Sequence, residues 1–569
     1  MTKRLIGTMK AIISGNKTTV DMKKAYIFFL ALSLLAFVPG CVKDQRIDGL
    51  KLVAEGSRNG DSKMVINGDY SEWAAGDEVR INGTTTTVQL IDGAAYASGG
   101  SFEAPFYGIY PASIYRNAAG TSYTVNIPGT YTYATSDGKQ VLQSPMAGYA
   151  ESGNYVYFRH LTSAVTVQIT NYYGFAVIVD SVIVISNSYK LHGDVSFTLG
   201  DDISIPATAK AGGDTVVMLG GGLQVVSGNS VDVQVPVLPQ GSGNLFTLQV
   251  KVHKYNNTDV KRRFDSTQPS SHPLARNQIG YAPMTVGFPF TISATKRVII
   301  SQGNLRYQAS TNTWQFAENQ YDYIGKNVGN TTAEASRSGQ SDWIDLFGWG
   351  TSGWSNGNTS YMPYANSTTV STYQSQSLIG DAANADWGVY NKILNGGNIK
   401  GKWRTMTNGS GKEIDYLFKT RATVTTNLPE GSNKESARYV KARVGTGVEN
   451  VKGIIIFPDN YNHPADVDIT RGASPSTTYN GPLTYYDGFT VDAAGWKKME
   501  SEGCVFLPAA GYRTNVLVNN AGTDAYYWSS SVNATQAYAL KYIDGGYSYS
   551  YTSIARNYGC AVRLVQDIE

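Results

Sequence analysis

The stretch AVTVQIT at residues 164–170 alternates apolar and polar residues with a period of two. This period is typical of a β-strand that buries one face, because successive side chains on a strand point to opposite sides. It places Val165, Val167 and Ile169 together on the buried face. The stretch therefore predicts a strand that covers a hydrophobic core.

A second alternating run, VDVQVP at residues 231–236, ends in a proline. Proline lacks the N–H that a central strand needs, so we expect Pro236 to end this strand or to lie at a sheet edge. Asn-Gly and Asp-Gly pairs, which favour tight turns, fall between such runs, and helix signals are almost absent before residue 290. We predict two tandem β-sandwiches, over residues 42–154 and 155–289.

The tryptophans divide the chain of 569 residues. Of nine tryptophans only Trp73 precedes residue 290, and the others lie between Trp314 and Trp528. This shift predicts a separate domain over residues 290–569. Charged residues make up 16% of the chain and the net charge is only +3, which argues against the concentrated basic face that nucleic acid requires.

A leader is expected over residues 1–41, with Met22 as the expected start. The segment MKKAYIFFLALSLLAFVPGC at residues 22–41 has a basic beginning and an apolar centre too short to span a membrane. It ends in VPGC, which resembles a bacterial lipobox, so Cys41 is the predicted lipidation site. An ordinary signal peptide with an incidental cysteine is the alternative.

Four motifs occur in order in the first part of the chain: EWAAGDEV at residues 72–79, FYGIYPAS at 106–113, FRHL at 158–161 and VPVLP at 235–239. Together they resemble the fimbrillin family of Bacteroidetes lipoproteins. The resemblance implies that the two sandwiches are transthyretin-like. It also implies a pilus subunit or surface adhesin on the cell outer membrane.

In the last part of the chain, long Gly- and Asn-rich loops separate short apolar runs. We predict an α+β domain with short helices at residues 413–418, with Tyr416 and Leu417 inward, and 493–500. Strands are expected at residues 453–457, 504–508 and 561–565.

Four motifs mark this last domain: SQGNL at residues 301–305, DLFGWG at 345–350, FLPAAGYR at 506–513 and YWSSS at 527–531. Through them it resembles the C-type-lectin-like domains of Bacteroidetes surface proteins. Related folds include glycan binders and formylglycine-generating oxidases, so the fold alone does not fix the function. The calcium-site signatures of such lectins are absent.

The sequence offers little support for a catalytic function. No G-x-S-x-G or H-E-x-x-H motif occurs, and the five histidines lack metal-ligand spacing. Cys504 and Cys560 each lie in a strand-like run, which favours a structural disulfide over a redox pair. We therefore predict no enzyme, catalytic residue, metal or cofactor; an oxidase or hydrolase remains the third class of function.

A loop rich in rings and amides is the candidate ligand site. Sugars are bound without metal by aromatic faces and by amides that read the hydroxyls. Trp354, Asn356, Tyr361 and Tyr364 offer both groups within one loop-like tract. The alternative for each ring is a place in the core. The expected ligand is a host or bacterial surface glycan, or a protein.

The fimbrillin resemblance also implies assembly by strand exchange between pilus subunits. Residues 49–55 are the candidate leading strand, and Arg58 after them is the expected protease site. Few residues follow the expected last strand at 561–565, which predicts an acceptor without a donor, hence a pilus tip or minor subunit. The alternative is a lipoprotein that captures glycans and never polymerises.

Overall fold

The computed structural model divides the chain into residues 1–50 and 51–569, and the fold below is that of the second unit. Within the described ranges the protein is mostly β, as predicted. The predicted leader, Cys41 and Arg58 lie outside those ranges. The described residues are 49–55, 73–136, 138–201, 203, 212–269, 273–336, 339–422, 424–425, 436–467, 489–543 and 550–568.

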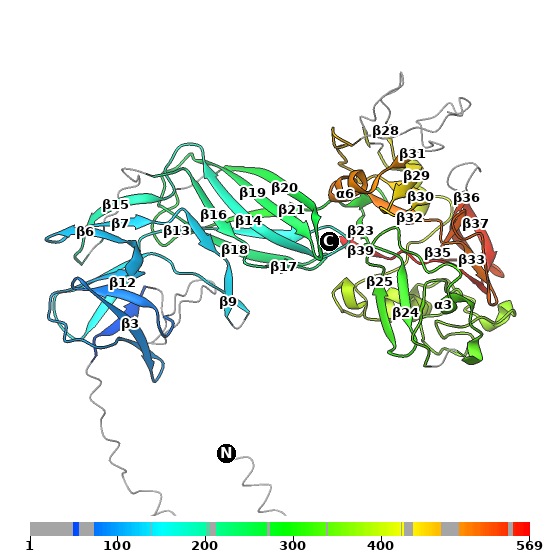
Figure 1. Cartoon of the computed structure of the whole chain (residues 1–569), viewed down its shortest axis with the longest axis horizontal. Helices are drawn as coiled ribbons and strands as arrows, with labels where there is room; N and C mark the ends of the chain where they lie inside the picture. The colour runs from blue at the N-terminus through cyan, green and yellow to red at the C-terminus, as the bar shows by residue number, and fades with distance from the viewer. Residues whose placement is uncertain are drawn as a thin grey trace, which may run out of the picture. The chain divides into compact units, whose positions relative to one another are not determined.

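The first sheet closes on itself as a barrel (Figure 1, dark to light blue strands). Its centre holds Trp73, which packs edge to face on Tyr110 and Phe158 at ring distances of 4.9 and 5.1 Å. In order around the barrel the strands are β1 (Lys51–Ala54), β12 (Tyr155–His160), β11 (Met146–Ala150), β5 (Phe106–Tyr110), β2 (Glu78–Ile81), β3 (Thr84–Ile91) and β4 (Ala94–Ala97).

This barrel differs from the β-sandwich predicted over residues 42–154. Its sheet is closed, because β1 pairs with both β12 and β4. The sheet also continues past residue 154, since β12 begins at Tyr155 and pairs with β11 and β1.

Two glycines allow the barrel to close tightly around one ring. Gly108 of β5 and Gly148 of β11 are direct cross-strand partners. A Cβ atom at Gly108 would lie 2.3 Å from the Phe158 ring, and one at Gly148 would lie 3.0 Å from it. The pair therefore makes room for Phe158, which a larger side chain would displace.

The next part is a β-sandwich with one hydrophobic core between two sheets. Val165, Val167 and Ile169 are all buried in this core, as predicted, and Pro236 lies in an edge strand, as predicted. One sheet contains β18 (Ser230–Val237), β13 (Ser163–Asn171) and β21 (Ile279–Val286). The other contains β20 (Asn257–Pro269), β19 (Leu245–Lys254), β14 (Val177–Ser186), β16 (Thr215–Leu219), β8 (Thr130–Thr132) and β17 (Gln224–Val225).

Two strands that precede β11 and β12 in the sequence pair with strands that follow the barrel. Strand β8 pairs in parallel with β16, and β7 pairs with β15. The remaining elements before Phe290, which belong to neither the barrel nor the two sandwich sheets, are η1 (Ala112–Ile114), β6 (Tyr115–Ala119), β7 (Ser122–Ile127), β9 (Ala134–Ser136), β10 (Lys139–Val141) and β15 (Gly193–Thr198).

From Phe290 onward, small sheets and short helices surround several hydrophobic clusters. The sheets comprise β22 (Phe290–Thr291), β23 (Arg297–Ile300) and β39 (Val565–Ile568); β24 (Leu305–Gln308), β25 (Thr313–Phe316) and β26 (Trp343–Ile344); β27 (Val424–Thr425) and β28 (Ser436–Ala437); β29 (Tyr439–Gly445), β30 (Asn450–Ile456), β31 (Phe489–Val491) and β32 (Val505–Pro508); β33 (Tyr512–Thr514), β34 (Leu517–Asn519) and β38 (Tyr558–Gly559); β35 (Asp524–Asn533), β36 (Gln536–Ile543) and β37 (Ser550–Ala555).

The helices are short. The predicted helix at 493–500 is α6 (Ala493–Ser501), which buries Trp496. The one predicted at 413–418 begins as α5 (Glu413–Asp415) and continues as a wider turn, η6 (Tyr416–Thr420), with Leu417 buried and Tyr416 only half-buried. The others are α3 (Val328–Thr331), η2 (Glu334–Ser336), η3 (Val370–Thr372), η4 (Gly380–Ala385), α4 (Trp387–Tyr390) and η5 (Leu394–Gly396). Among the described residues, no helix combines the length and apolar character needed to cross a membrane.

The last strand is shifted from its predicted place. Residues 561–564 are buried without belonging to a strand, and β39 covers Val565–Ile568 instead. It pairs with β23 along its whole length, and Arg404 holds Asp567 through two hydrogen bonds of 2.8 and 2.6 Å. The final described residues are therefore part of a sheet.

The predicted Cys504–Cys560 disulfide is absent, and both cysteines are free, buried thiols. Cys504 precedes β32 and packs in a cluster with Trp496 and Phe506, whereas Cys560 follows β38 in a cluster with Phe347. The prediction placed them in neighbouring strands of one sheet, but they belong to different sheets and different cores. Burial raises the pKa of both thiols well above the usual value, so both stay protonated near neutral pH.

Candidate functional site

The loop predicted to bind ligand is closed on itself by its own hydrogen bonds. The Gly353 N–H donates to the Tyr361 carbonyl at 2.9 Å, and the Asn358 side chain donates to Asn356 Oδ1 at 2.7 Å. Trp354 and Tyr364 are half-buried and pack against the cluster that contains Trp349 and Trp387.

A pocket of about 420 Å³ lies beside this loop. Of the four predicted ligand residues, only Tyr364 lines it; Trp354, Asn356 and Tyr361 do not. The remaining lining comes from β24, β25, the turn between them and the end of α4, together with residues beside the loop. It consists of Tyr307, Ala309, Asn312, Trp314, Gly339, Ser352, Gly353, Met362, Pro363, Tyr390 and Asn391.

Aromatic rings line the pocket together with amides. Tyr307 and Trp314 are buried cross-strand partners with ring centroids 4.6 Å apart, and they are joined by the half-buried Tyr364 and Tyr390. Asn312 is exposed in the turn that joins β24 to β25, at a positive φ of 50° that asparagine tolerates well. The pocket thus offers ring faces together with a polar side chain at the surface.

The hydrogen bonds in the pocket hold the polar groups in place. The Tyr307 hydroxyl donates to Asn312 Oδ1 at 3.2 Å, which leaves the Asn312 amide N–H groups for a ligand. Burial raises the pKa of Tyr307 to about 12, so this hydroxyl stays protonated near neutral pH. Asn391 donates to the carbonyls of Ser352 and Trp387 at 2.9 and 3.1 Å.

Sequence reasoning missed Tyr307, Asn312 and Tyr390, because they lie far from the predicted loop along the chain. The signal for Asn312 was a short polar stretch, Thr311-Asn312-Thr313, between two apolar strand-like runs. The pocket brings these residues together only through the pairing of β24 with β25 and the place of α4.

The predicted leading strand is β1, and it occupies a complete slot in the barrel. It pairs in parallel with β12 from Lys51 to Ala54 and antiparallel with β4 at Lys51 and Leu52. Leu52 and Ala54 face inward, each 2% exposed, while Lys51 and Val53 are half-buried. Loss of β1 would therefore leave two unpaired edges beside an apolar groove.

The end of β1 is also tied to the sandwich. Glu55 Oε2 accepts hydrogen bonds from the His160 backbone N–H at 3.0 Å and from Arg276 at 2.6 Å. Arg276 also donates to the His160 carbonyl at 3.1 Å. Glu55 thus completes a polar cluster that joins β1, β12 and the segment before β21.

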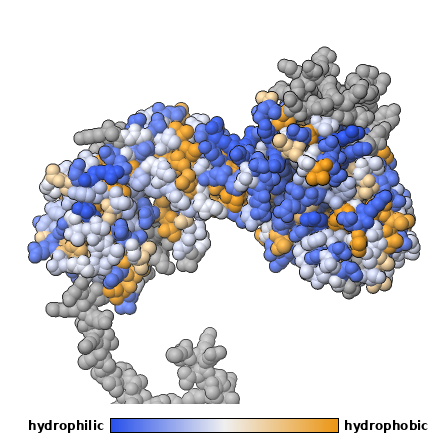
Figure 2. Space-filling view, viewed as in Figure 1, coloured by the Kyte–Doolittle hydropathy of each residue, from blue (hydrophilic) through white to orange (hydrophobic). Residues whose placement is uncertain are grey.

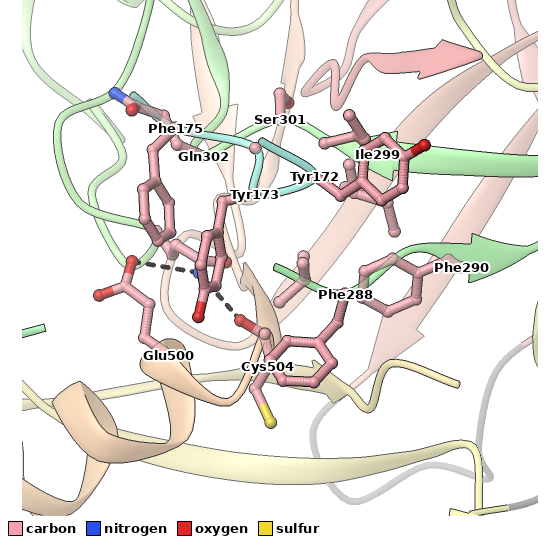
Figure 3. Close-up of a pocket in the computed structure, with 15 residues that line it drawn as sticks. Tyr172, Tyr173, Phe175, Phe288, Phe290, Ile299, Ser301, Gln302, Glu500 and Cys504 are labelled. Atoms are coloured by element: carbon pink, nitrogen blue, oxygen red, sulfur yellow. Dashed lines mark hydrogen bonds between the residues drawn. The ribbon is translucent and has the colours of Figure 1, made fainter. Parts of the chain in front are cut away.

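A small cavity of about 20 Å³, between the β13–β14 connection and the residues around α6, is too small for a ligand and marks a tight joint (Figure 3). Lys254 and Glu500 form a buried ion pair of 2.8 Å with side chains 6% and 5% exposed. Gln320 donates to Glu500 Oε1 at 3.2 Å and to the Cys504 carbonyl at 3.0 Å, and the Tyr173 hydroxyl donates to the Ser501 carbonyl.

The backbones approach closely at the same joint. A Cβ atom at Gly174 would lie 1.9 Å from the Ile300 carbonyl oxygen, so only glycine fits there. The Gln302 N–H donates to the Gly174 carbonyl at 3.1 Å. The small cavity at this joint is therefore enclosed by closely packed backbone and hydrogen-bonded side chains, and it is not a binding site.

No family model matches the chain, and no curated protein matches it. Several solved structures do match. A candidate cell adhesion protein from Bacteroides uniformis shares 15% identity over 42% of this chain and 94% of its own, with a TM-score of 0.26. Another, from Bacteroides fragilis, shares 10% over 48% of this chain and all of its own, with a TM-score of 0.24. A fimbrial protein from Bacteroides ovatus shares 10% over 92% of this chain and 99% of its own, with a TM-score of 0.22. Identities and TM-scores at this level show no common function.

Proposed function

We propose that this protein is a surface adhesin of the fimbrillin type, with a lectin-like last domain that binds a ligand and a first strand that a neighbouring subunit replaces. The observation that carries the proposal is β1. It is a short strand at the start of the described chain, paired on both sides and buried through Leu52 and Ala54. A strand in that place can be exchanged for another by main-chain hydrogen bonding.

The finer assignment is a tip or minor subunit. Residues 565–568 are held in β39 by β23 and by the Arg404–Asp567 ion pair, so this segment is not free to fill a neighbour's groove. A subunit that keeps β39 in its own sheet does not lend that strand to a neighbour, which supports a place at the end of a filament, where a ligand-binding domain is useful. The alternative, a non-polymerising lipoprotein that captures glycans, keeps β1 in place.

The proposed anchor is a lipid on Cys41, supported by the VPGC sequence at residues 38–41. A diacylated cysteine holds a protein stably on a membrane, whereas a single chain does so marginally. We expect a Cys41→Ala protein to leave the outer-membrane fraction, with loss of acyl-chain labelling as the direct measurement. Unchanged labelling and fractionation would remove the lipoprotein assignment.

The proposed ligand site is the pocket around Tyr364, and its chemistry fits a glycan. The half-buried rings of Tyr364 and Tyr390 offer faces for the apolar side of a sugar, and Asn312 offers amide N–H groups for hydroxyls. Nothing in this pocket requires turnover, and among the described residues no group of three His, Cys, Asp or Glu side chains is placed to hold a metal. The proposed activity is therefore binding.

A glycan array probed with the whole chain tests this site. We expect Tyr364→Ala to weaken the strongest signal about tenfold, since a lost ring contact costs about 1.4 kcal/mol. Tyr361→Ala is the matched control, because Tyr361 is half-buried in the same loop but does not line the pocket. Equal loss in both variants, or no loss in either, would contradict the site.

A further inference from the structure

A second cavity lies beside the joint and shares Gln302 with the small cavity. It is an open groove of about 490 Å³, lined on one side by the sandwich and on the other by the last domain. The sandwich contributes the β19–β20 turn and Gln224 of β17, and the last domain contributes Gln315 of β25 and Asn398 after η5. None of these residues belongs to the Tyr364 pocket.

The groove walls are held by contacts on two sides. Lys254 lines the groove and is fixed by its buried ion pair with Glu500. Next to the lining residue Val226, the Ser227 carbonyl accepts a hydrogen bond of 2.5 Å from Lys402, which also donates to Asn229 at 3.0 Å. The groove is therefore formed before any ligand arrives, which reduces the entropic cost of binding.

Each wall is also locally rigid. Tyr255 and Asn256 form the two-residue turn between β19 and β20, where Lys254 pairs with Asn257 and Asn256 adopts a φ of 63°. On the opposite wall, Asn395 exchanges two hydrogen bonds with the Phe316 backbone, at 2.7 and 3.0 Å. Tight turns that present polar and aromatic side chains from a rigid scaffold are frequent binding elements.

The lining is rich in amides and poor in net charge. The side chains of Gln224, Asn256, Gln315 and Asn398 form no hydrogen bonds with other described residues, so their donors and acceptors are available to a ligand. Tyr255 is 46% exposed although it occupies a turn, where folding gives no reason for an aromatic ring. Lys254 is neutralised by Glu500, and Glu318 is the other charged residue in the lining.

We propose that this groove is a second binding site, which takes a neutral oligosaccharide between the sandwich and the last domain. The Tyr255 ring stacks on a sugar face, and the four amides read the hydroxyls. A charged glycan is disfavoured because the lining offers no free cation for it. The site depends on neither strand exchange nor the Tyr364 pocket.

Saturation-transfer NMR with the whole chain tests the groove, using the hexasaccharides of glucose (α1,4 and β1,4), xylose and mannose as probes and a galacturonic acid hexamer as the acidic comparison. We expect at least one neutral probe to bind and the acidic one not to bind. Tyr255→Ala and Gln315→Ala should each weaken that probe at least tenfold.

Two controls make the result specific. Tyr281→Ala removes a tyrosine that is 60% exposed elsewhere on the sandwich, and Tyr364→Ala removes the other pocket's ring. Both should leave the affinity for the probe within twofold. The groove assignment is overturned if no neutral probe binds, if Tyr255→Ala binds normally, or if Tyr364→Ala alone abolishes binding.

Discussion

Cleavage after Arg58 is expected to make β1 exchangeable, so that the cut protein takes up a labelled synthetic peptide of residues 49–55 while the intact protein does not. The cut removes the covalent link that returns β1 to its slot between β12 and β4. Loss of the strand costs several kcal/mol, since burial of Leu52 contributes about 1.5–3 kcal/mol and each ladder hydrogen bond about 0.5–1.5 kcal/mol. The vacated slot therefore binds a matching strand strongly.

Peptide uptake is measured by fluorescence anisotropy after treatment with a trypsin-type protease. Arg58→Ala protein is the matched control, and a peptide with Leu52→Asp tests whether the apolar groove selects the strand. We expect uptake by the cut protein alone, at least tenfold weaker for the Leu52→Asp peptide. No uptake by either protein would show that β1 is a permanent part of the barrel, and equal uptake by the cut and Arg58→Ala proteins would show that exchange does not depend on the cut.

Glu500→Ala is expected to lower the free energy of unfolding by about 3–5 kcal/mol, because it leaves the ammonium of Lys254 buried without its partner. Replacement of both partners, as Lys254→Met with Glu500→Leu, should restore most of the loss. Chemical denaturation measures each difference, and a small effect of Glu500→Ala would mean that the joint opens to water.

The matched control for the joint is the exposed pair of Lys497 and Asp259, which links α6 to β20 at 2.6 Å. Its side chains are 39% and 66% exposed, so Lys497→Ala should cost at most about 1 kcal/mol. A loss as large as that of Glu500→Ala would show that charge across the joint matters rather than burial. The comparison separates these two causes.

The alternation of apolar residues predicted the sandwich strands well. Val165, Val167 and Ile169 lie in the core because a period of two assigns a whole strand face at once. The edge position of Pro236 followed from its missing N–H. These are local properties, and local properties can be read from sequence.

Long-range pairing could not be read in the same way. The parallel pair of β1 with β12 joins residues about 100 positions apart, and nothing in LVA or YVYF specifies the partner. The disulfide prediction failed for the same reason, since the strand-like runs around Cys504 and Cys560 belong to different sheets. The Tyr364 pocket is also built from separate segments of the chain, so Tyr364 is the one lining residue that the sequence predicted.

Immunogold electron microscopy of cells that carry the natural protein tests the central claim most directly. The account predicts gold at the free ends of filaments, because a subunit that accepts a strand through the β1 slot and holds its own β39 in a sheet ends the chain of subunits. Gold along the filament shafts would contradict the tip position. Gold on the cell surface away from any filament would contradict assembly and leave β1 as an ordinary barrel strand.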